Sequence, residues 1–305
     1  MTLVRKIRKG DIRSIARLIS MVENDDPDAL PFLEVVSRHG VPARIIGITG
    51  PAGAGKSSLI NLLIKEFRKR NERVGVLAVD PTSPFSGGSL LGDRLRMREH
   101  LADSKVFIRS LASRLGPGGI AHAIPQAVRV LGAAHFENVI IETVGAGQDE
   151  VDILGLAGVV LVVLAPGFGD EVQVLKAGLL EVGDLLVLNK SDLPESHLLE
   201  QHLLQAGVPA GLLFPVSALK GDRIAALVDR IDRLYGEKDS EEIWRQFCRW
   251  EMRHLLEKVL VEEGMRRIGV DPLEDAATRV ARRETDPHAA LAKLIKRIYG
   301  TSRNR

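Results

Sequence analysis

Between residues 44 and 218 the chain alternates short apolar runs with longer stretches of helical periodicity. The apolar runs are RIIGIT, VGVLAVD, KVFIRS, NVIIETVG, GVVLVVLAP, DLLVLNK and LLFPVSA, in that order. Several of them are continuous rather than alternating and rich in β-branched residues, which is typical of strands buried on both faces of a sheet. This alternation predicts an α/β fold with a mainly parallel sheet flanked by helices.

Both ends of the chain lack such runs and show helical periodicity instead. Near the start, Asp11 precedes a stretch with apolar residues at helical spacing and is a candidate helix N-cap. Near the end, one apolar helical stripe precedes two shorter helical segments. The stripe consists of Trp244, Cys248, Met252, Leu255, Leu256 and Val259. We therefore predict a helical N-terminal arm at 1–42, a central α/β domain at 43–236 and a helical C-terminal segment at 237–305. This last segment is too small for a large core of its own and must pack on the central domain, on another subunit, or on both.

Composition and charge argue against several functions for this chain of 305 residues. With 42 basic and 40 acidic residues the net charge is +2, which gives no bias toward nucleic acid or a membrane surface. Cys248 is the single cysteine of the sequence, so an internal disulfide and a Cys-rich metal site are excluded. The opening MTLVRKIRKGDIRS has no apolar core of signal-peptide length, and the apolar run Gly158 to Pro166 is too short to span a bilayer. We expect a cytoplasmic protein that binds neither nucleic acid nor membranes.

The segment GITGPAGAGKSSLI carries the first chemical signal. It follows a predicted strand, precedes a predicted helix and has the G-x-x-x-x-G-K-S spacing of a phosphate-binding loop. Backbone N–H groups of such a loop, with the helix N-terminus behind them, bind phosphate oxygens. Lys56 would reach the β- and γ-phosphates, and Ser57 would bind magnesium. The candidate nucleotide contacts in this loop are Gly50, Pro51, Ala52, Gly53, Ala54, Gly55, Lys56, Ser57 and Ser58.

Acidic residues at two other strand ends are candidates for the metal environment. Asp80 ends VGVLAVD, and Glu142 lies in NVIIETVGAGQ. Open α/β sheets bind their ligands at the carboxyl ends of the strands, and oxygen ligands suit magnesium. Together with Ser57 these carboxylates predict a magnesium site, although each of them alone could equally cap a helix.

Two later strand ends indicate which base the nucleotide carries. The motif Asn189-Lys190-Ser191-Asp192 follows one strand, and its aspartate can accept hydrogen bonds from guanine N1–H and from the N2 amine at once. Adenine lacks that donor pair, so the carboxylate would discriminate against it. Asn189 would brace the loop, and the Lys190 stem would stack on the base. The VSALKG segment follows the next strand, where a backbone N–H near Ala218 would meet guanine O6. Its candidate contacts are Ser217, Ala218 and Leu219. The combination predicts GTP and GDP as ligands.

Three further segments carry a family resemblance. VLAVDPTSPFSGGSLLGDRLRM, IIETVGAGQDEVD and PGFGDEVQVLKAG, in this order, resemble the MeaB/ArgK family of P-loop GTPases, which includes the methylmalonic aciduria type A protein. The resemblance covers nearly the whole chain and implies a P-loop NTPase fold of the SIMIBI type. It implies a Mg²⁺-dependent GTPase that acts as a metallochaperone-type G protein. Such a protein gates adenosylcobalamin loading and protects or reactivates a B12-dependent acyl-CoA mutase, either methylmalonyl-CoA mutase or a relative.

The resemblance also concerns partners. It implies a homodimer formed through the C-terminal helices, and it allows a contact with an adenosyltransferase. The sequence contains no cobalamin-type Asp-x-His-x-x-Gly segment. We therefore expect the mutase, and not this chain, to hold the cobalamin.

Carried over position by position, the resemblance implies roles for four more residues. Asp93 and Arg96 match the switch I region, where Asp93 belongs to the magnesium environment and Arg96 is a basic residue. Asp170 and Lys176 match a third switch segment, which senses the mutase and helps it to stimulate hydrolysis. The candidate catalytic residues are therefore Lys56, Asp93, Arg96, Glu142, Asp170 and Lys176.

The third switch departs from the family pattern. It reads DEVQVLKAG in place of DELQGIKKG, with Val174 for glycine and Ala177 for lysine, which leaves the choice of mutase open.

Two other functions stay open. A nickel-delivery GTPase would carry a Cys or His cluster, whereas this chain has 8 scattered histidines and one cysteine. A small-molecule kinase would need an acceptor pocket and would not need to select guanine.

Overall fold

The computed structural model describes residues 2–40, 43–81, 98–100, 102–113, 123–143, 149–167 and 183–299. The chain divides into two compact units, Met1–Trp250 and Glu251–Arg305. The finer division into an arm, a central domain and a C-terminal segment stays a prediction.

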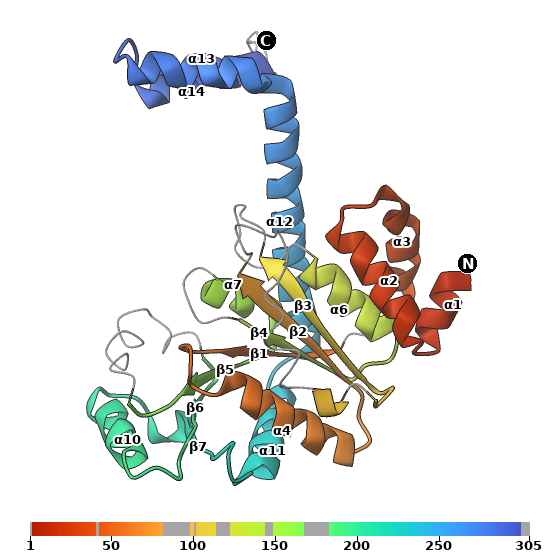
Figure 1. Cartoon of the computed structure of the whole chain (residues 1–305), viewed down its shortest axis with the longest axis vertical. Helices are drawn as coiled ribbons and strands as arrows, with labels where there is room; N and C mark the ends of the chain where they lie inside the picture. The colour runs from red at the N-terminus through yellow and green to blue at the C-terminus, as the bar shows by residue number, and fades with distance from the viewer. Residues whose placement is uncertain are drawn as a thin grey trace. The chain divides into compact units, whose positions relative to one another are not determined.

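Among the described residues, a seven-stranded parallel sheet forms the centre of the first unit (Figure 1). Its strands are β1 (Arg44–Thr49), β2 (Val74–Pro81), β3 (Val106–Ser113), β4 (Asn138–Glu142), β5 (Val159–Leu164), β6 (Leu185–Leu188) and β7 (Leu213–Pro215). Their order across the sheet is β3-β2-β4-β1-β5-β6-β7. β4, β5 and β6 are buried along their whole length, as expected for continuous apolar runs in a sheet covered on both faces. The prediction of a mainly parallel α/β sheet is confirmed.

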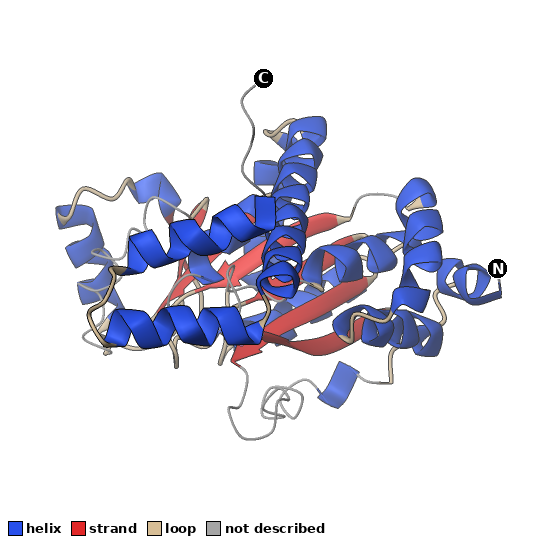
Figure 2. Ribbon diagram, turned by 90° about the horizontal axis from the view of Figure 1, so that it is seen from above, coloured by secondary structure: helices blue, strands red, loops and turns tan. Residues whose placement is uncertain are grey.

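Helices cover both faces of this sheet (Figures 1 and 2). They are α1 (Thr2–Arg8), α2 (Ile12–Glu23), α3 (Leu30–His39), α4 (Lys56–Lys69), α6 (Ile124–Ala133), α7 (Asp149–Leu156), α10 (Ser196–Gln205) and α11 (Ile224–Gly236), with the 3-10 turns η1 (Pro27–Ala29), η2 (Arg98–His100) and η3 (Ala210–Leu212). Alternate residues of a strand point to opposite faces. Accordingly, Ile45 belongs to the core beneath α2, α6 and α7, whereas Ile46 belongs to the core beneath α4 and α11.

The N-terminal helices join the first of these cores. Asp11 caps α2, as predicted, because its side chain accepts a hydrogen bond from the Ser14 N–H over 2.9 Å. Arg109 of β3 reaches α2 from the edge of the sheet. Its guanidinium donates to the Ala16 carbonyl at 3.1 Å and to Ser20 Oγ at 2.9 Å, which ties the edge strand to the arm.

Three further helices follow α11: α12 (Ser240–Ile268), α13 (Val270–Ala281) and α14 (Pro287–Tyr299). Their periodicity was visible in the sequence, and Gly269, with a φ of 77°, separates α12 from α13. Large apolar side chains of the second unit are exposed. They are Met252, Leu255, Leu256, Val259, Leu260, Val261, Met265, Val270, Leu273, Leu291 and Ile295. In the described part of the chain, no helix combines the length and the apolar character that crossing a membrane requires.

Candidate functional site

The phosphate loop and the base motif both begin at the carboxyl ends of strands, on the same side of the sheet. Gly50 follows β1, Asn189 follows β6, and Glu142 ends β4, whose residues pair in parallel with those of β1. The backbone of Asp80 lies at the corresponding end of β2, opposite Ala112 of β3. Because the strands are parallel, the phosphate loop, the base motif and both candidate carboxylate positions lie at the carboxyl ends of the strands, where open α/β sheets bind ligands.

The glycines of the phosphate loop are required by its conformation. Gly50, Gly53 and Gly55 have φ values of 134°, 78° and 92°, which L side chains rarely adopt. Close packing adds a second constraint at two of them. A Cβ on Gly50 would lie 2.1 Å from the Val163 carbonyl oxygen, and one on Gly55 would lie 2.3 Å from Asn189 Nδ2. The loop can therefore approach β5 and the base motif only with glycine at these positions.

Lys56 opens α4 and is buried, with 8 % of its surface exposed. Its ammonium group donates to the carbonyl oxygens of Gly50 at 2.7 Å and of Pro51 at 3.1 Å. These bonds hold a positive charge inside the loop, next to the N-terminal end of the α4 dipole. The combination is suited to phosphate oxygens, since both groups favour negative charge at this point. Ala52, Gly53 and Ser58 of the same segment are exposed, whereas Ala54 is buried.

Ser57 and Glu142 meet at the start of α4. The Ser57 hydroxyl donates to Glu142 Oε1 over 2.9 Å, and both side chains are buried. A hydroxyl and a carboxylate are hard oxygen donors of the kind that magnesium prefers, and the ion usually keeps several water ligands. These two residues therefore fit a magnesium ion, held directly or through water. The Asp80 side chain lies outside the described part of the structure, so its place in this site stays a prediction.

Asn189 connects the phosphate loop to both segments of the base site. Its Nδ2 donates to the Ala54 carbonyl at 2.8 Å, and its Oδ1 accepts from the amides of Lys190 at 2.8 Å and Ala218 at 3.0 Å. The expected bracing role is thus seen in the contacts. The Ala218 amide, which we expected to face guanine O6, is already engaged by Asn189, and its contact with the base stays a prediction. Lys190 has a φ of 60°, which turns the chain sharply after the strand.

Asp192 is held as an ionised acceptor. The Ser217 hydroxyl donates to its Oδ1 and lowers the pKa of the Asp192 carboxyl below its usual range, with a smaller contribution from the charge of Lys220. Ser217 is completely buried and also accepts a bond from the Lys220 amide at 3.2 Å. Leu219, two positions after Ser217, is 86 % exposed, so an apolar side chain lies at the rim of the candidate base site.

Four predicted residues lie outside the described part of the chain: Asp93, Arg96, Asp170 and Lys176. Their roles stay predictions. The structure adds two residues that sequence reasoning missed, Thr49 and Thr143. Their hydroxyls form a buried hydrogen bond of 2.9 Å directly behind the phosphate loop and Glu142. Both residues stand next to a motif, but their pairing depends on the register of two strands far apart in sequence.

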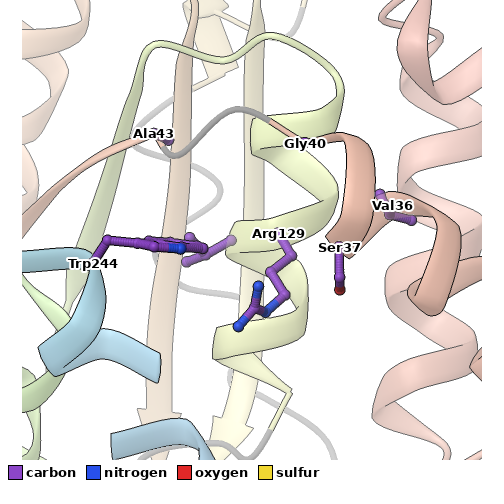
Figure 3. Close-up of a pocket in the computed structure, with 7 residues that line it drawn as sticks. Val36, Ser37, Gly40, Ala43, Arg129 and Trp244 are labelled. Carbon is purple, nitrogen blue, oxygen red and sulfur yellow. The ribbon is translucent and has the colours of Figure 1, made fainter. Parts of the chain in front are cut away.

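A separate small cavity lies between α3, α6 and α12, within the first unit (Figure 3). Arg129 of α6 stacks over the Trp244 ring of α12 at 5.0 Å, and Ser37 of α3 completes one wall. The cavity volume is about 10 Å³, which is about the space that one water molecule needs. It is a packing feature and is too small for a substrate.

Comparisons with known proteins show which family this chain resembles. The family model of the methylmalonyl-CoA mutase-associated GTPase MeaB matches residues 15–241. A Pyrococcus abyssi protein named as a GTPase is 39 % identical over 314 residues, which cover 98 % of this chain and 96 % of the relative. A fused isobutyryl-CoA mutase of Cupriavidus metallidurans is 38 % identical over 197 residues, or 63 % of this chain and 18 % of that protein.

Among solved structures, a LAO/AO transport system kinase aligns with a TM-score of 0.70 at 20 % identity. The alignment covers 97 % of this chain and 96 % of that one, and it supports the P-loop fold. The family match extends over the phosphate loop, Glu142 and both base segments, that is, over all the described parts of the nucleotide site. The chain belongs to the MeaB family and is a P-loop GTPase.

Proposed function

We propose that this protein is a G-protein chaperone that uses GTP to gate adenosylcobalamin loading and to protect or reactivate a B12-dependent acyl-CoA mutase. The observation that carries the proposal is the relative in which a similar segment is fused to isobutyryl-CoA mutase. Covalent fusion keeps two activities at a fixed ratio and at a high effective concentration. The description of the matching family, a mutase-associated GTPase, supports the same partner class.

The chemistry of hydrolysis requires binding and charge neutralisation more than covalent catalysis by side chains. The phosphate loop and Lys56 would bind and orient the β- and γ-phosphates, and Ser57 and Glu142, whose side chains share a hydrogen bond, would hold the magnesium ion. When bound, this ion neutralises charge on the phosphate oxygens. Asp80 and Asp93 belong to the same metal environment in our proposal. Arg96, Asp170 and Lys176 are the residues through which a partner would complete the site and raise the rate.

Base selection follows from Asp192. Its ionised carboxylate, with Ser217 fixing one oxygen, is ready to accept the paired donors of guanine. Lys190 and Leu219 would cover the two faces of the base, and Ala218 or its neighbour would meet O6. An adenine would leave the carboxylate without donors, so GTP is the preferred triphosphate.

The proposed assembly has further parts. The exposed apolar side chains of the second unit, such as Leu256 and Val259, favour a homodimer through the C-terminal helices. Contact with an adenosyltransferase is compatible with a role in cofactor loading. We assign the cobalamin to the mutase and the protein to the cytoplasm.

The test is hydrolysis of GTP and of ATP by the purified chain, alone and with methylmalonyl-CoA mutase or isobutyryl-CoA mutase. We expect slow hydrolysis of GTP, little hydrolysis of ATP, and at least about tenfold stimulation by one of the mutases, because completing a GTPase site with a partner's groups raises rates by several orders of magnitude. Lys56→Ala is the control and should abolish hydrolysis with and without the mutase. Equal use of ATP, or a GTPase rate that neither mutase changes, would contradict the proposal.

A further inference from the structure

We propose that Thr49 and Thr143 form a positioning pair for GTP hydrolysis, which holds Glu142 against Ser57 without contacting the nucleotide. The inference rests on the proposed role of Ser57 and Glu142 in holding magnesium. It concerns a hydrogen bond between two threonines that lie 94 positions apart in the sequence.

Thr49 is the last residue of β1, and Thr143 directly follows β4. The Thr143 hydroxyl donates to Thr49 Oγ1 over 2.9 Å, and the Thr143 amide donates to the Ile48 carbonyl over 3.1 Å. Both threonines are completely buried. The two bonds extend the connection between β1 and β4 by one residue beyond the point where β4 ends.

The pair lies on the opposite face of the sheet from Ser57. Ile48 pairs with Glu142 in the β1–β4 register, and Ile48 belongs to the core beneath α4. Glu142 therefore points toward α4, where its carboxylate meets Ser57. Since side chains alternate along a strand, Thr49 and Thr143 point away from α4. They act on the site through the backbone, by fixing the direction of the chain directly after Glu142 and directly before the phosphate loop.

A buried hydroxyl pair at this point does more than fill space. Valine has nearly the same shape as threonine and would pack equally well, but it cannot donate a hydrogen bond. The side-chain bond adds a directional link where the backbone ladder has only the Thr143 amide left to contribute. The start of the phosphate loop and the end of β4 are thus held to each other, and with them the two oxygens that meet at 2.9 Å in front of α4.

Four variants separate positioning from general stability: Thr143→Val, Thr49→Val, the double valine variant, and Thr143→Ser. Each single valine leaves one buried hydroxyl without its partner and lowers the unfolding midpoint. The double valine removes both hydroxyls, and replacing both partners by apolar groups restores most of that stability. The readouts are the unfolding midpoint, kcat and KM for GTP, and the Mg²⁺ concentration that half-saturates binding of a fluorescent GDP analogue.

We expect Thr143→Val to lower kcat about tenfold and to raise the half-saturating Mg²⁺ concentration several-fold at little change in KM, since a displacement well below 1 Å at a reacting site has effects of this order. The double valine should recover the unfolding midpoint but not kcat. Thr143→Ser keeps the donor, so its kcat and its half-saturating Mg²⁺ concentration should stay within about twofold of those of the parent. Recovery of kcat together with the midpoint in the double variant would overturn the inference, and so would a Thr143→Ser variant as slow as Thr143→Val.

Glu142→Gln distinguishes failure of the pair from failure of the site. If Glu142→Gln impairs Mg²⁺ dependence while Thr143→Val keeps the parent kcat, the positioning pair alone is refuted. If Glu142→Gln changes neither kcat nor Mg²⁺ dependence, the proposed role of Glu142 fails, and the inference fails with it.

Discussion

At the residue scale, our proposal gives the choice of base to a single carboxylate. Asp192 is an aspartate that is ionised at neutral pH, and the Ser217 hydroxyl lowers its pKa further; Ser217 is itself fixed by burial and by the Lys220 amide. The acceptor is therefore oriented by the protein before any base contact forms. Selectivity would then arise because a nucleotide without the matching donors leaves this oriented charge without hydrogen bonds.

Asp192→Asn should change the nucleotide preference of the site from GTP to xanthosine triphosphate. The amide offers a donor where the carboxylate was an acceptor, which suits the additional carbonyl oxygen of xanthine. We expect affinity for GTP to fall at least about 100-fold while that for the xanthine nucleotide rises, as measured by competition against a fluorescent GDP analogue. Glu195→Gln, at a nearby exposed carboxylate, is the control and should keep the GTP preference. An unchanged preference in Asp192→Asn would refute the base assignment.

Residues within one continuous motif could be assigned from the sequence, whereas contacts between motifs could not. Spacing alone located Lys56 and Ser57, and their contacts are compatible with the expected chemistry. The Thr49–Thr143 bond and the engagement of the Ala218 amide by Asn189 depend on strand register and loop packing, which no local pattern encodes.

At the scale of elements, the first turns of α12 are fitted between α6 and α7. Trp244 and Phe247 stack on each other at 4.8 Å, and Arg129 of α6 covers both rings. On the other side, Gln246 donates to the Leu154 carbonyl of α7 at 2.8 Å. The start of α12 is therefore held by shape as well as by apolar burial.

Gly155→Ala tests this fit. A Cβ at Gly155 would lie 2.0 Å from Cδ1 of the Trp250 ring, so either helix has to shift. Overpacking of this kind costs about 1–3 kcal/mol, against a gain in helix propensity of at most about 1 kcal/mol. We expect the unfolding midpoint to fall by a few degrees in calorimetry. Gly236→Ala, where a helical Cβ meets no atom within 4 Å, is the matched control and should be neutral or slightly stabilising. Equal midpoints for the two variants would contradict the packing argument.

Every strand of the described sheet was expected from an apolar run, but the strands do not all begin and end where the runs do. The run KVFIRS ends at Ser110, whereas β3 continues to Ser113 because it pairs with β2 along the full length of that strand. α3 begins at Leu30, and Pro31 lies in its first turn, where a missing N–H costs nothing. Strand pairing sets the end of β3, and the residues of the first helical turn set the start of α3. Neither boundary can be predicted from hydrophobic periodicity.

The molecule as a whole combines a well-covered nucleotide unit with a second unit that exposes much of its apolar surface. In the first unit the sheet is buried on both faces. In the second unit Met252, Leu256 and Val259 recur at helical spacing on α12 and are all exposed. Such a stripe favours association with another protein surface. The order of the strands in the sheet was not predictable from the sequence, because it depends on which crossovers pack best.

Leu256→Glu combined with Val259→Glu should convert the proposed homodimer to a monomer. Two carboxylates in an apolar contact would be desolvated without partners, which costs several kcal/mol and removes the apolar gain. Sedimentation equilibrium of the parent and the variant at equal concentration measures the change. Arg17→Glu adds a carboxylate at an exposed position of α2 in the first unit and should keep the parent mass. A parent that sediments as a monomer, or a double variant that remains a dimer, would contradict the assembly.

The close approach of Gly55 to Asn189 has a consequence for the kinetics of nucleotide exchange. Hydrogen bonds within the protein join the phosphate loop to both base segments through this one amide side chain. An arriving nucleotide therefore does not need to order these segments against each other, and little binding energy is lost as conformational entropy. Differences in affinity among nucleotides should then appear mainly as differences in residence time. A partner that disturbs the Asn189 junction would weaken the hold on base and phosphates together, and would thereby act as an exchange factor.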